Sequence, residues 1–401
     1  NSGKRPKRRR TIKSMKNNMK TKDPQTRQKE PLLHLVKAPA APLYKSILIK
    51  VGALLISLLL RATICSLLSN NSILDFFVYL FKGAIGLGSA RPERRIYTLL
   101  GETALLLCVA LALLPAFKMR FWNLGGNGQI MISCIATMLI IKLLGGVWPD
   151  WLVIIVMIVA GVLAGAVWAV IPAIFKAFFK TNESLFTLMM NYIAMGLGTY
   201  FITAFADSGS NTILPVQNPV LPDIGGNEYF LSIIVVALIT AFMCVYLKFG
   251  KHGFEISIVG GSENTAKYVG LNVKKVIIRT LALSGALCGV VGVLLVGSIH
   301  HTVTPNLSHD MGFTAIMVAW LGKLDPILIV VASLFITFID KGMSTVNTEF
   351  GITSSASSNI VLGLIYFFII GSEFFIEYQI KLRDKKKFPF GHFLKDGGKK
   401  Q

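Results

Sequence analysis

The chain has 401 residues, of which 53% are hydrophobic and only 15% are charged, and its mean hydropathy is +0.62. Soluble domains carry about 25% charged residues. Several apolar runs exceed about 18 residues, the length that a helix needs to cross a bilayer. The composition therefore excludes a soluble enzyme and a disordered chain. It predicts an all-α, polytopic membrane bundle.

The net charge of +21 lies almost entirely at the two ends of the chain. Residues 1–50 carry 15 Lys and Arg against two acids, and residues 381–401 carry eight against two. No nucleic-acid-binding motif accompanies these ends, so we expect no nucleic-acid partner. The positive-inside rule predicts that both ends lie in the cytoplasm. Two ends on one side require an even number of crossings.

The chain is expected to have three parts. These are a basic cytoplasmic tail (1–43), a transmembrane domain (44–382) and a second basic cytoplasmic tail (383–401). All five cysteines lie in apolar stretches without metal or redox spacing, which predicts no disulfide, no metal and no cofactor.

Hydropathy and loop charge predict seven spans before residue 300. In chain order they are residues 47–68, 97–117, 124–145, 151–175, 185–206, 229–248 and 276–299. Residues 73–88 are apolar but short and contain Asp75 and Lys82. We expect an interfacial or re-entrant helix there and not a crossing. The loop 207–228 has no Lys or Arg and is expected outside, whereas the loop 250–275 is basic and expected inside.

The remaining residues decide whether the count is even. If 312–340 were one span, a final span at 359–380 would make nine and put the basic C-terminus outside. A break at the sequence GKLDP gives a short span (312–322) and a span at 326–340, for about ten in all. The short span covers only about 16 Å at 1.5 Å per residue. We therefore expect a broken helix that lines protein or water.

Small residues spaced by four predict close helix packing. Gly161 and Gly165 form one such pair, and Gly285 and Gly289 form another. Small residues at these spacings let helix backbones approach one another in a membrane.

Polar side chains cluster at the start of the third span, in the sequence FWNLGGNGQIM. Asn123, Asn127 and Gln129 stand among three glycines there, and amides both donate and accept hydrogen bonds. This pattern suits contact with an uncharged polar solute; the alternative is a cytoplasmic turn whose amides cap a helix. Asn191 either contacts the solute or makes a buried interhelical hydrogen bond. Glu102 and Glu373 are single acids within two spans, and we expect that each is there by chance or lies at an interface.

The sequence contains no recognisable nucleotide-binding or catalytic motif. The sequence GGSENTAKY resembles a phosphate-binding loop only faintly, because Ala266 replaces the second glycine and Tyr268 the Ser or Thr. No nucleophile elbow or HExxH motif occurs. We expect no catalytic residue and no enzyme, so energy must come from an ion gradient or another subunit.

Four stretches between about residues 97 and 340 resemble a known family. FWNLGGNGQIMIS resembles its F-N-I-G-x-E-G-Q block, and AGVLAGAVWAVIPAIFKAFFKTNESLFTLMMNYIA resembles its G-A-x-W-x-x-I-P and N-E-x-x-x-T-x-M-x-N-Y segments. GFEISIVGGSENTAKYVGLNVKK and GFTAIMVAWLGKLDP resemble two further blocks. The chain is similar to membrane permease subunits of ATP-binding-cassette (ABC) importers in the branched-chain amino acid and simple-sugar superfamily, and most similar to the nucleoside-type permeases.

The resemblance implies a role for the loop 250–275, with a short helix around 262–269. In the family this loop couples the permease to its ATPase subunit. The implied coupling residues are Gly260, Ser262, Glu263, Asn264, Ala266, Tyr268 and Gly270. Asn127 stands where the family has Glu, so the resemblance does not imply a charge-based role at this position. Ser257 stands where the family has Arg, so the docking surface for the partner differs from the family pattern.

The resemblance predicts an importer permease for a nucleoside or simple sugar, working by alternating access in the bacterial inner membrane. Its expected partners are an ATPase subunit, a second permease, an extracytoplasmic substrate-binding protein and the lipid bilayer. The alternative is an ion-coupled secondary transporter, which would need a paired intramembrane acid or a cation site.

Overall fold

The computed structural model describes residues 33–37, 42–69, 71–88, 91–206, 212–352 and 356–382. The chain divides into two units, one of residues 1–53 and 370–401 and the other of residues 54–369. Most of both predicted tails, part of the predicted outer loop 207–228 and the side chain of Glu373 lie outside the described residues.

Ten helices coincide with the ten predicted spans, which confirms the all-α, polytopic fold. They are α2 (Leu43–Ser69), α4 (Pro92–Lys118), α5 (Gly126–Leu144), α6 (Asp150–Phe179), α7 (Glu183–Phe205), α8 (Phe230–Phe249), α11 (Val273–Leu294), α12 (Met311–Leu321), α13 (Pro326–Glu349) and α14 (Ala356–Glu377). Among the described residues, eight helices are long and apolar enough to cross a membrane. The other two are α12, with 11 residues, and α14, whose apolar part is Gly363–Ser372.

The smaller unit contains a two-stranded sheet that the sequence did not predict. Strand β1 (Leu33–Lys37) pairs antiparallel with β2 (Tyr378–Leu382), and Leu33 lies opposite Leu382. The last span was predicted to run to residue 380, but α14 ends at Glu377 and the chain is extended from there.

The short helix α3 (Ile73–Ile85) occupies the segment predicted as an interfacial or re-entrant helix. Its two charges lie at its two ends. Asp75 completes a capping box with Ser72, and Lys82 lies in the last turn, where a cation suits the helix dipole. The helix packs on α13 through buried residues that include Phe76 and Leu80.

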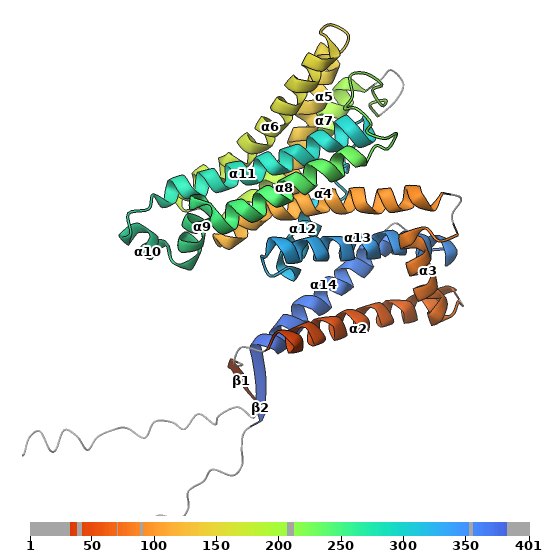
Figure 1. Ribbon diagram of the computed structural model, residues 1–401. Helices are drawn as coiled ribbons and strands as arrows, with labels where there is room; N and C mark the ends of the chain where they lie inside the picture. The colour runs from red at the N-terminus through yellow and green to blue at the C-terminus, as the bar shows by residue number, and fades with distance from the viewer. Residues whose placement is uncertain are drawn as a thin grey trace, which may run out of the picture. The chain divides into compact units, whose positions relative to one another are not determined.

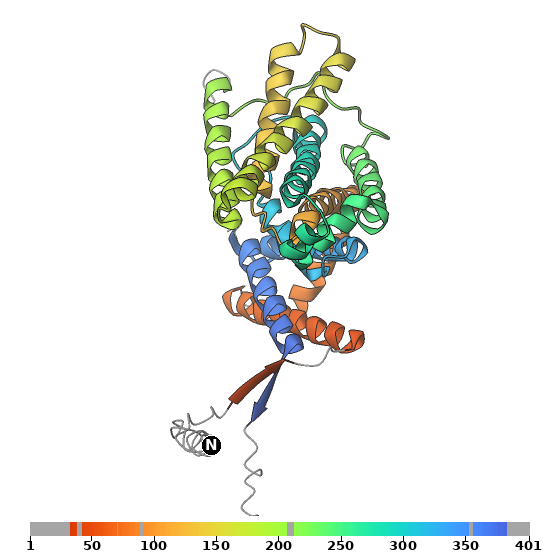
Figure 2. The ribbon, with the colours of Figure 1, turned by 90° about the vertical axis from the view of Figure 1, so that its left-hand side faces the viewer.

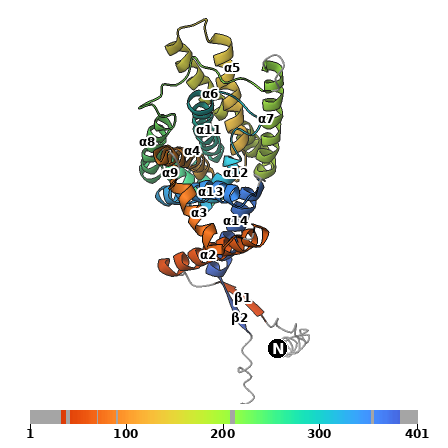
Figure 3. The ribbon, with the colours of Figure 1, turned by 90° about the vertical axis from the view of Figure 1, so that its right-hand side faces the viewer.

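Helix α4 lies at the centre of the larger unit. It contacts α8 and α11 on one side and α12 and α13 on the other (Figures 1 and 3). Within its span 89% of the residues are buried, against 22% in α6 and in α8. The apolar surfaces of α6 and α8 therefore remain to face lipid, and α4 forms the core.

Helices α6 and α11 pack closely along their length (Figure 2). A Cβ atom added to Gly165 would lie 2.5 Å from the carbonyl oxygen of Gly285. A Cβ atom on Gly289 would lie 2.8 Å from the Cα of Val162. The two small-residue pairs predicted from the sequence thus meet across one interface, where any side chain would separate the helices.

The predicted break at GKLDP separates α12 from α13. Lys323 and Leu324 both have positive φ, and the helix restarts at Pro326 in its first position. The Asp325 carboxylate accepts hydrogen bonds from the N–H groups of Ile327 (2.9 Å) and Leu328 (3.3 Å). This cap satisfies donors that a helix start leaves free.

Helix α13 is longer than predicted. The span was expected to end at residue 340, but the helix continues to Glu349. The reason is an ion pair, since the Nζ of Lys341 lies 2.5 Å from Oε1 of Glu102 on α4. Because Glu102 pairs with Lys341, the lysine can lie inside the bundle and α13 can continue past it.

The segment 250–275 forms two short helices, α9 (Lys251–Gly261) and α10 (Glu263–Tyr268). The second lies where a short helix was expected. Beyond it, α11 runs into a π-helical turn, η1 (Leu295–His300), that carries the chain to the loop before α12.

Candidate functional site

The four predicted amides gather in one buried cluster. Asn123 Nδ2 donates to the hydroxyl of Ser284 on α11 (3.1 Å), and its Oδ1 accepts from the N–H of Gly125 (3.0 Å) and from Nε2 of Gln129 (3.2 Å). Asn191 reaches across from α7. Its Oδ1 accepts from the N–H of Gly128 (2.8 Å) and its Nδ2 donates to the carbonyl of Leu124 (2.6 Å).

Asn127 connects this cluster to α12. Its Oδ1 accepts from the N–H of Gly312 (2.6 Å), and its Nδ2 donates to Oδ1 of Asp310 (3.2 Å). The amides therefore serve as caps, as one reading of the sequence allowed, and also as interhelical bonds. Buried polar groups satisfied in this way fix the positions of their helices.

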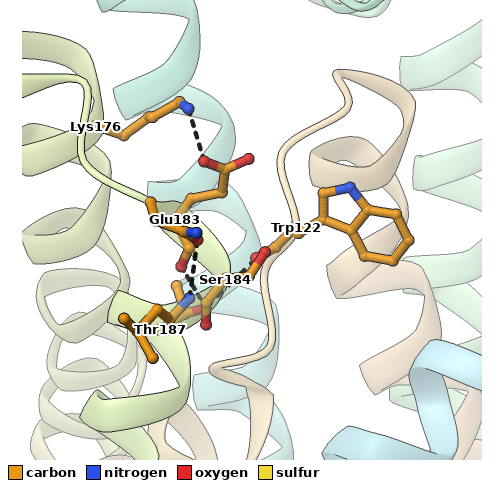
Figure 4. A network of polar contacts seen from close by, with 7 residues as sticks. Trp122, Lys176, Glu183, Ser184 and Thr187 are labelled. Atoms are coloured by element: carbon orange, nitrogen blue, oxygen red, sulfur yellow. Dashed lines mark hydrogen bonds and ion pairs between the residues drawn. The ribbon is translucent and has the colours of Figure 1, made fainter.

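The loop 121–125 is also held at the start of α7 (Figure 4). The Thr187 hydroxyl accepts from the N–H of Leu124 (3.1 Å) and donates to the carbonyl of Glu183 (2.8 Å), while the carbonyl of Trp122 lies 3.4 Å away. Lys176 on α6 pairs with the Glu183 carboxylate at 2.6 Å. The end of α6, the start of α7 and the loop before α5 thus form one connected unit.

A large cavity is lined in part by Asp310. Its volume is about 1160 Å³, and it is bounded by α4, η1, the loop before α12, α12, α13 and α14. None of the four predicted amides lines it, although Asp310 does and so joins the cavity to the amide cluster. The role of the amides in solute contact stays a prediction.

One wall of the cavity is a polar stripe on α13. Its members lie three or four residues apart, so they share a helix face. They are Thr337, Asp340, Lys341, Ser344, Asn347 and Thr348. This stripe was not predicted, because the predicted span ended at residue 340. Polar residues repeating at helical spacing through ITFIDKGMSTVNT were the signal that was available.

The facing wall comes mainly from α4 and the start of α8. Glu102 projects from α4 and forms the ion pair with Lys341, whereas Leu105 and Leu106 are apolar. Tyr229, just before α8, also lines the cavity. Burial, and then the neighbouring carboxylates of Glu102 and Glu228, raise the pKa of Tyr229 to about 12. Its hydroxyl therefore stays protonated at neutral pH and able to donate a hydrogen bond.

The loop before α12 lines the cavity with strained backbone. His309 has φ of 42° and Asp310 has φ of 56°, in the left-handed region that costs energy for residues with a Cβ atom. His300 also lines the cavity from η1. Among the described residues, no group of three or more His, Cys, Asp or Glu side chains is placed to hold a metal ion.

The predicted coupling residues lie on α9 and α10, away from the cavity. Gly260 is buried against the end of α4, where an added Cβ atom would lie 2.1 Å from the carbonyl oxygen of Lys118. Ser262 caps α10 by accepting from the N–H of Thr265 (3.3 Å). Ala266 is fully buried, and Gly270 has φ of 80°.

The rest of α10 faces solvent. Glu263, Asn264 and Tyr268 are exposed, and the Tyr268 side chain is 91% exposed. A small pocket of about 190 Å³ lies beside it, between Arg120, Lys176 and the segment 259–263. Helix α10 is thus anchored by one buried alanine and presents its other residues outward.

A buried histidine fixes α9 against the bundle. His252 Nδ1 is hydrogen-bonded to the Tyr246 hydroxyl on α8, and its Nε2 lies 3.3 Å from the Thr280 hydroxyl on α11. Glu255 pairs with Arg279 of α11 at 3.6 Å. Burial, and then the Arg279 charge, lower the pKa of His252. The ring is therefore neutral at pH 7 and bonds two helices without carrying charge.

These features define a polytopic helical membrane protein with a solute-sized cavity of polar and apolar lining, and with a two-helix element whose second helix, α10, is exposed. The model of the family described as "Branched-chain amino acid transport system / permease component" matches residues 95–370. The chain belongs to this permease family.

The names of similar proteins refer to different substrates. The chain is 27% identical to the nucleoside ABC transporter permease protein NupB of Lactococcus lactis, over 84% of this chain and 93% of that protein. It is 27% identical to the guanosine ABC transporter permease protein NupP of Bacillus subtilis, over 65% of this chain and 77% of that protein. It is 26% identical to the glucose ABC transporter permease protein TsgB13 of Haloferax volcanii, over 69% and 76%.

Proposed function

We propose that this permease moves a nucleoside, or otherwise a simple sugar, into a bacterial cell, by alternating access driven by a separate ATPase subunit. The observation that carries the proposal is the cavity. Its volume of about 1160 Å³ slightly exceeds the range of about 300–1,000 Å³ typical of small-molecule sites. It is therefore large enough to admit a solute of this size.

The lining of the cavity favours a nucleoside. Apolar side chains such as Leu105, Ile299 and Phe313 suit the faces of a base, and the polar stripe on α13 suits the hydroxyl groups of a ribose. Apolar pockets with a few placed polar groups are the usual form of small-molecule sites. A hexose would use the polar wall and leave the apolar wall without a partner. Two of the relatives named above are nucleoside permeases.

Family membership does not favour the ion-coupled alternative. The three relatives named above are ABC transporter permeases. We therefore prefer ATP-driven import to ion coupling.

A transport assay tests the proposed function. The permease is to be reconstituted in proteoliposomes with its proposed partners, the ATPase and the substrate-binding protein. We expect uptake of nucleosides that requires ATP and exceeds uptake of hexoses and branched-chain amino acids. Uptake driven by an ion gradient without ATP would overturn the ABC mechanism, and preferential uptake of hexoses would overturn the nucleoside assignment.

The ATPase is proposed to dock on α9 and α10. Three observations support this surface: α10 is exposed, Gly260 lets α9 approach the end of α4, and a small pocket lies beside them. A partner that pushes on α10 would move α9, and with it the helices α8 and α11 that His252 bonds. Rigid-body motion of this kind carries a signal from a partner to a distant site.

Replacing Tyr268 by alanine tests this docking surface. Exposed aromatic residues dominate protein interfaces, and loss of one typically costs about 2 kcal/mol or more. We expect the amount of ATPase that co-purifies with the permease to fall at least tenfold, with no change in thermal unfolding. Tyr200→Ala on α7 is the matched control because Tyr200 is 73% exposed but lies on another helix. Equal co-purification from both variants would contradict the assignment.

The substrate-binding protein is proposed to dock at the opposite end, beside the start of α4. A polar pocket of about 580 Å³ is found there, lined by charged residues of both signs, including Arg94, Asp223 and Glu228. Arg94 and Glu228 form an exposed ion pair at 3.7 Å. Mixed charges at an exposed surface suit a partner that docks and leaves, since they set orientation and association rate.

Both termini are proposed to lie in the cytoplasm. The charge of the two ends supports this, and so does the pairing of β1 with β2, since paired strands lie on the same side of a membrane. A second permease subunit completes the proposed assembly.

A further inference from the structure

Three carboxylates line the large cavity, and they differ in their partners. Glu102 is paired with Lys341 at 2.5 Å, and Asp310 accepts a hydrogen bond from Asn127 at 3.2 Å. Asp340 lines the same cavity from α13. Within the described part of the chain, Asp340 makes no hydrogen bond and no ion pair.

The helix geometry explains why Lys341 leaves Asp340 unpaired. Neighbouring residues on a helix point about 100° apart and do not face each other. Lys341 turns toward α4 and Glu102, whereas Asp340 remains on the cavity wall between Thr337 and Ser344. Lys341 is therefore already paired with one of the three acids that line the cavity.

An ionised side chain at membrane depth is costly and marks function unless it is paired. Asp340 is only partly exposed, so the water of the cavity hydrates it incompletely. A solute that donates hydrogen bonds to both carboxylate oxygens of Asp340 would replace the missing water molecules. Charge-assisted hydrogen bonds of this kind are about twice as strong as neutral ones.

We infer that Asp340 is a specificity-determining residue that binds two adjacent hydroxyl groups of the solute. Two neighbouring donors match the two oxygens of one carboxylate, and a vicinal diol is the donor pair that nucleosides and simple sugars share. Thr337 and Ser344, one turn away on either side, supply hydroxyls within the same wall. This inference rests on the proposed function, and it places selectivity in the permease as well as in its receptor.

The Glu102–Lys341 pair has a positioning role in this arrangement. Lys341 neutralises the charge of Glu102, so Glu102 does not compete with Asp340 for the hydrogen-bond donors of the solute.

The test uses the wild-type transporter, complete with its ATPase and receptor, in proteoliposomes. The nucleoside or hexose that the wild type transports is compared with an analogue lacking two adjacent hydroxyls, such as the 2′,3′-dideoxynucleoside. Each solute is present at a concentration that saturates the substrate-binding protein. The affinity of that protein then does not affect the ratio of uptake rates. The readout is the ratio of maximal uptake rates for solute and analogue.

We expect the wild type to favour the diol by about tenfold to a hundredfold, the range set by charged hydrogen bonds. Asp340→Asn keeps the shape but loses the charge and turns one acceptor into a donor, so its ratio should fall near one. Glu349→Gln is the matched control, because Glu349 is an exposed acid at the end of the same helix. Its ratio should equal that of the wild type.

The outcomes separate the two proposals. An unchanged ratio in Asp340→Asn, in a transporter that still moves the solute, overturns the role of Asp340 and leaves the proposed function standing. No ATP-dependent uptake of any nucleoside or sugar by the wild type overturns both. Should Asp340→Asn fail to assemble, Asp340→Glu and the wild-type ratio decide, since a wild-type ratio near one also overturns the inference.

Discussion

Replacing Lys341 by methionine is expected to destabilise the protein and to abolish most of its transport. Lys341 and Glu102 are each only about a quarter exposed, and their charged atoms lie 2.5 Å apart. Methionine keeps the length of the side chain but leaves the Glu102 carboxylate without its counter-ion inside the bundle. Breaking a buried pair costs about 3–5 kcal/mol, and cavity water reduces this to about 2 kcal/mol here. Thermal unfolding of the purified protein measures the loss.

A second substitution makes this prediction specific to the pair. Glu102→Gln in the Lys341→Met background removes the uncompensated charge, so stability should recover most of the way. Lys275→Met is the matched control, since Lys275 is an exposed lysine at the start of α11. If the double variant unfolds no later than Lys341→Met, the two charges do not compensate each other in the folded protein.

The sequence predicted the helices well because hydropathy is a local property. All ten predicted spans coincide with helices, and the break at GKLDP was found from charge parity and not from hydropathy, which is continuous across it. The structure shows why the break holds: two left-handed residues, Lys323 and Leu324, are followed by an aspartate cap. The residues that form the break are neighbours in the sequence, so it can be predicted from the sequence alone.

The cavity was not predicted because its polar wall depends on partners distant in sequence. The predicted span ended at residue 340, and Glu102 was expected in its own span by chance or at an interface. Their meaning changes once Glu102 and Lys341 are seen as a pair, which joins residues 239 positions apart. A single sequence does not reveal such a pairing, although the helical spacing of the polar residues beyond Asp340 indicated that the helix continued.

The amide cluster shows the opposite case. The sequence picked out Asn123, Asn127, Gln129 and Asn191, and the structure brings all four together. What the residue types did not reveal was the use of their hydrogen bonds. Apart from Oε1 of Gln129, which is buried without a partner, their side-chain atoms bond to backbone and side-chain groups around them. The bond from Asn127 to Asp310 links the cluster to the cavity, which the amides themselves do not line.

Replacing Gly285 by leucine is expected to separate α6 from α11. A Cβ atom at this position would lie 2.3 Å from the carbonyl oxygen of Gly165 and 2.5 Å from the Cβ of Ala169. The first of these is backbone, which moves only if the whole helix shifts. Overpacking a tight interface costs up to about 3 kcal/mol, and more when backbone must move. We expect a loss of about 3 kcal/mol or failure to fold, measured by thermal unfolding and by yield after size-exclusion chromatography.

The control for this variant is Gly196→Leu on α7. Nothing lies within 4 Å of a Cβ atom added at Gly196, which is a helical and exposed position. Leucine has a higher helix propensity than glycine by up to about 1 kcal/mol, so this variant should be as stable as the wild type or more so. Equal unfolding temperatures for Gly285→Leu and Gly196→Leu would show that α6 and α11 do not meet backbone to backbone. Helix α11 continues into η1, which lines the cavity, and its Thr280 is hydrogen-bonded to His252 of α9. A shift of α11 should therefore reduce transport even in protein that folds.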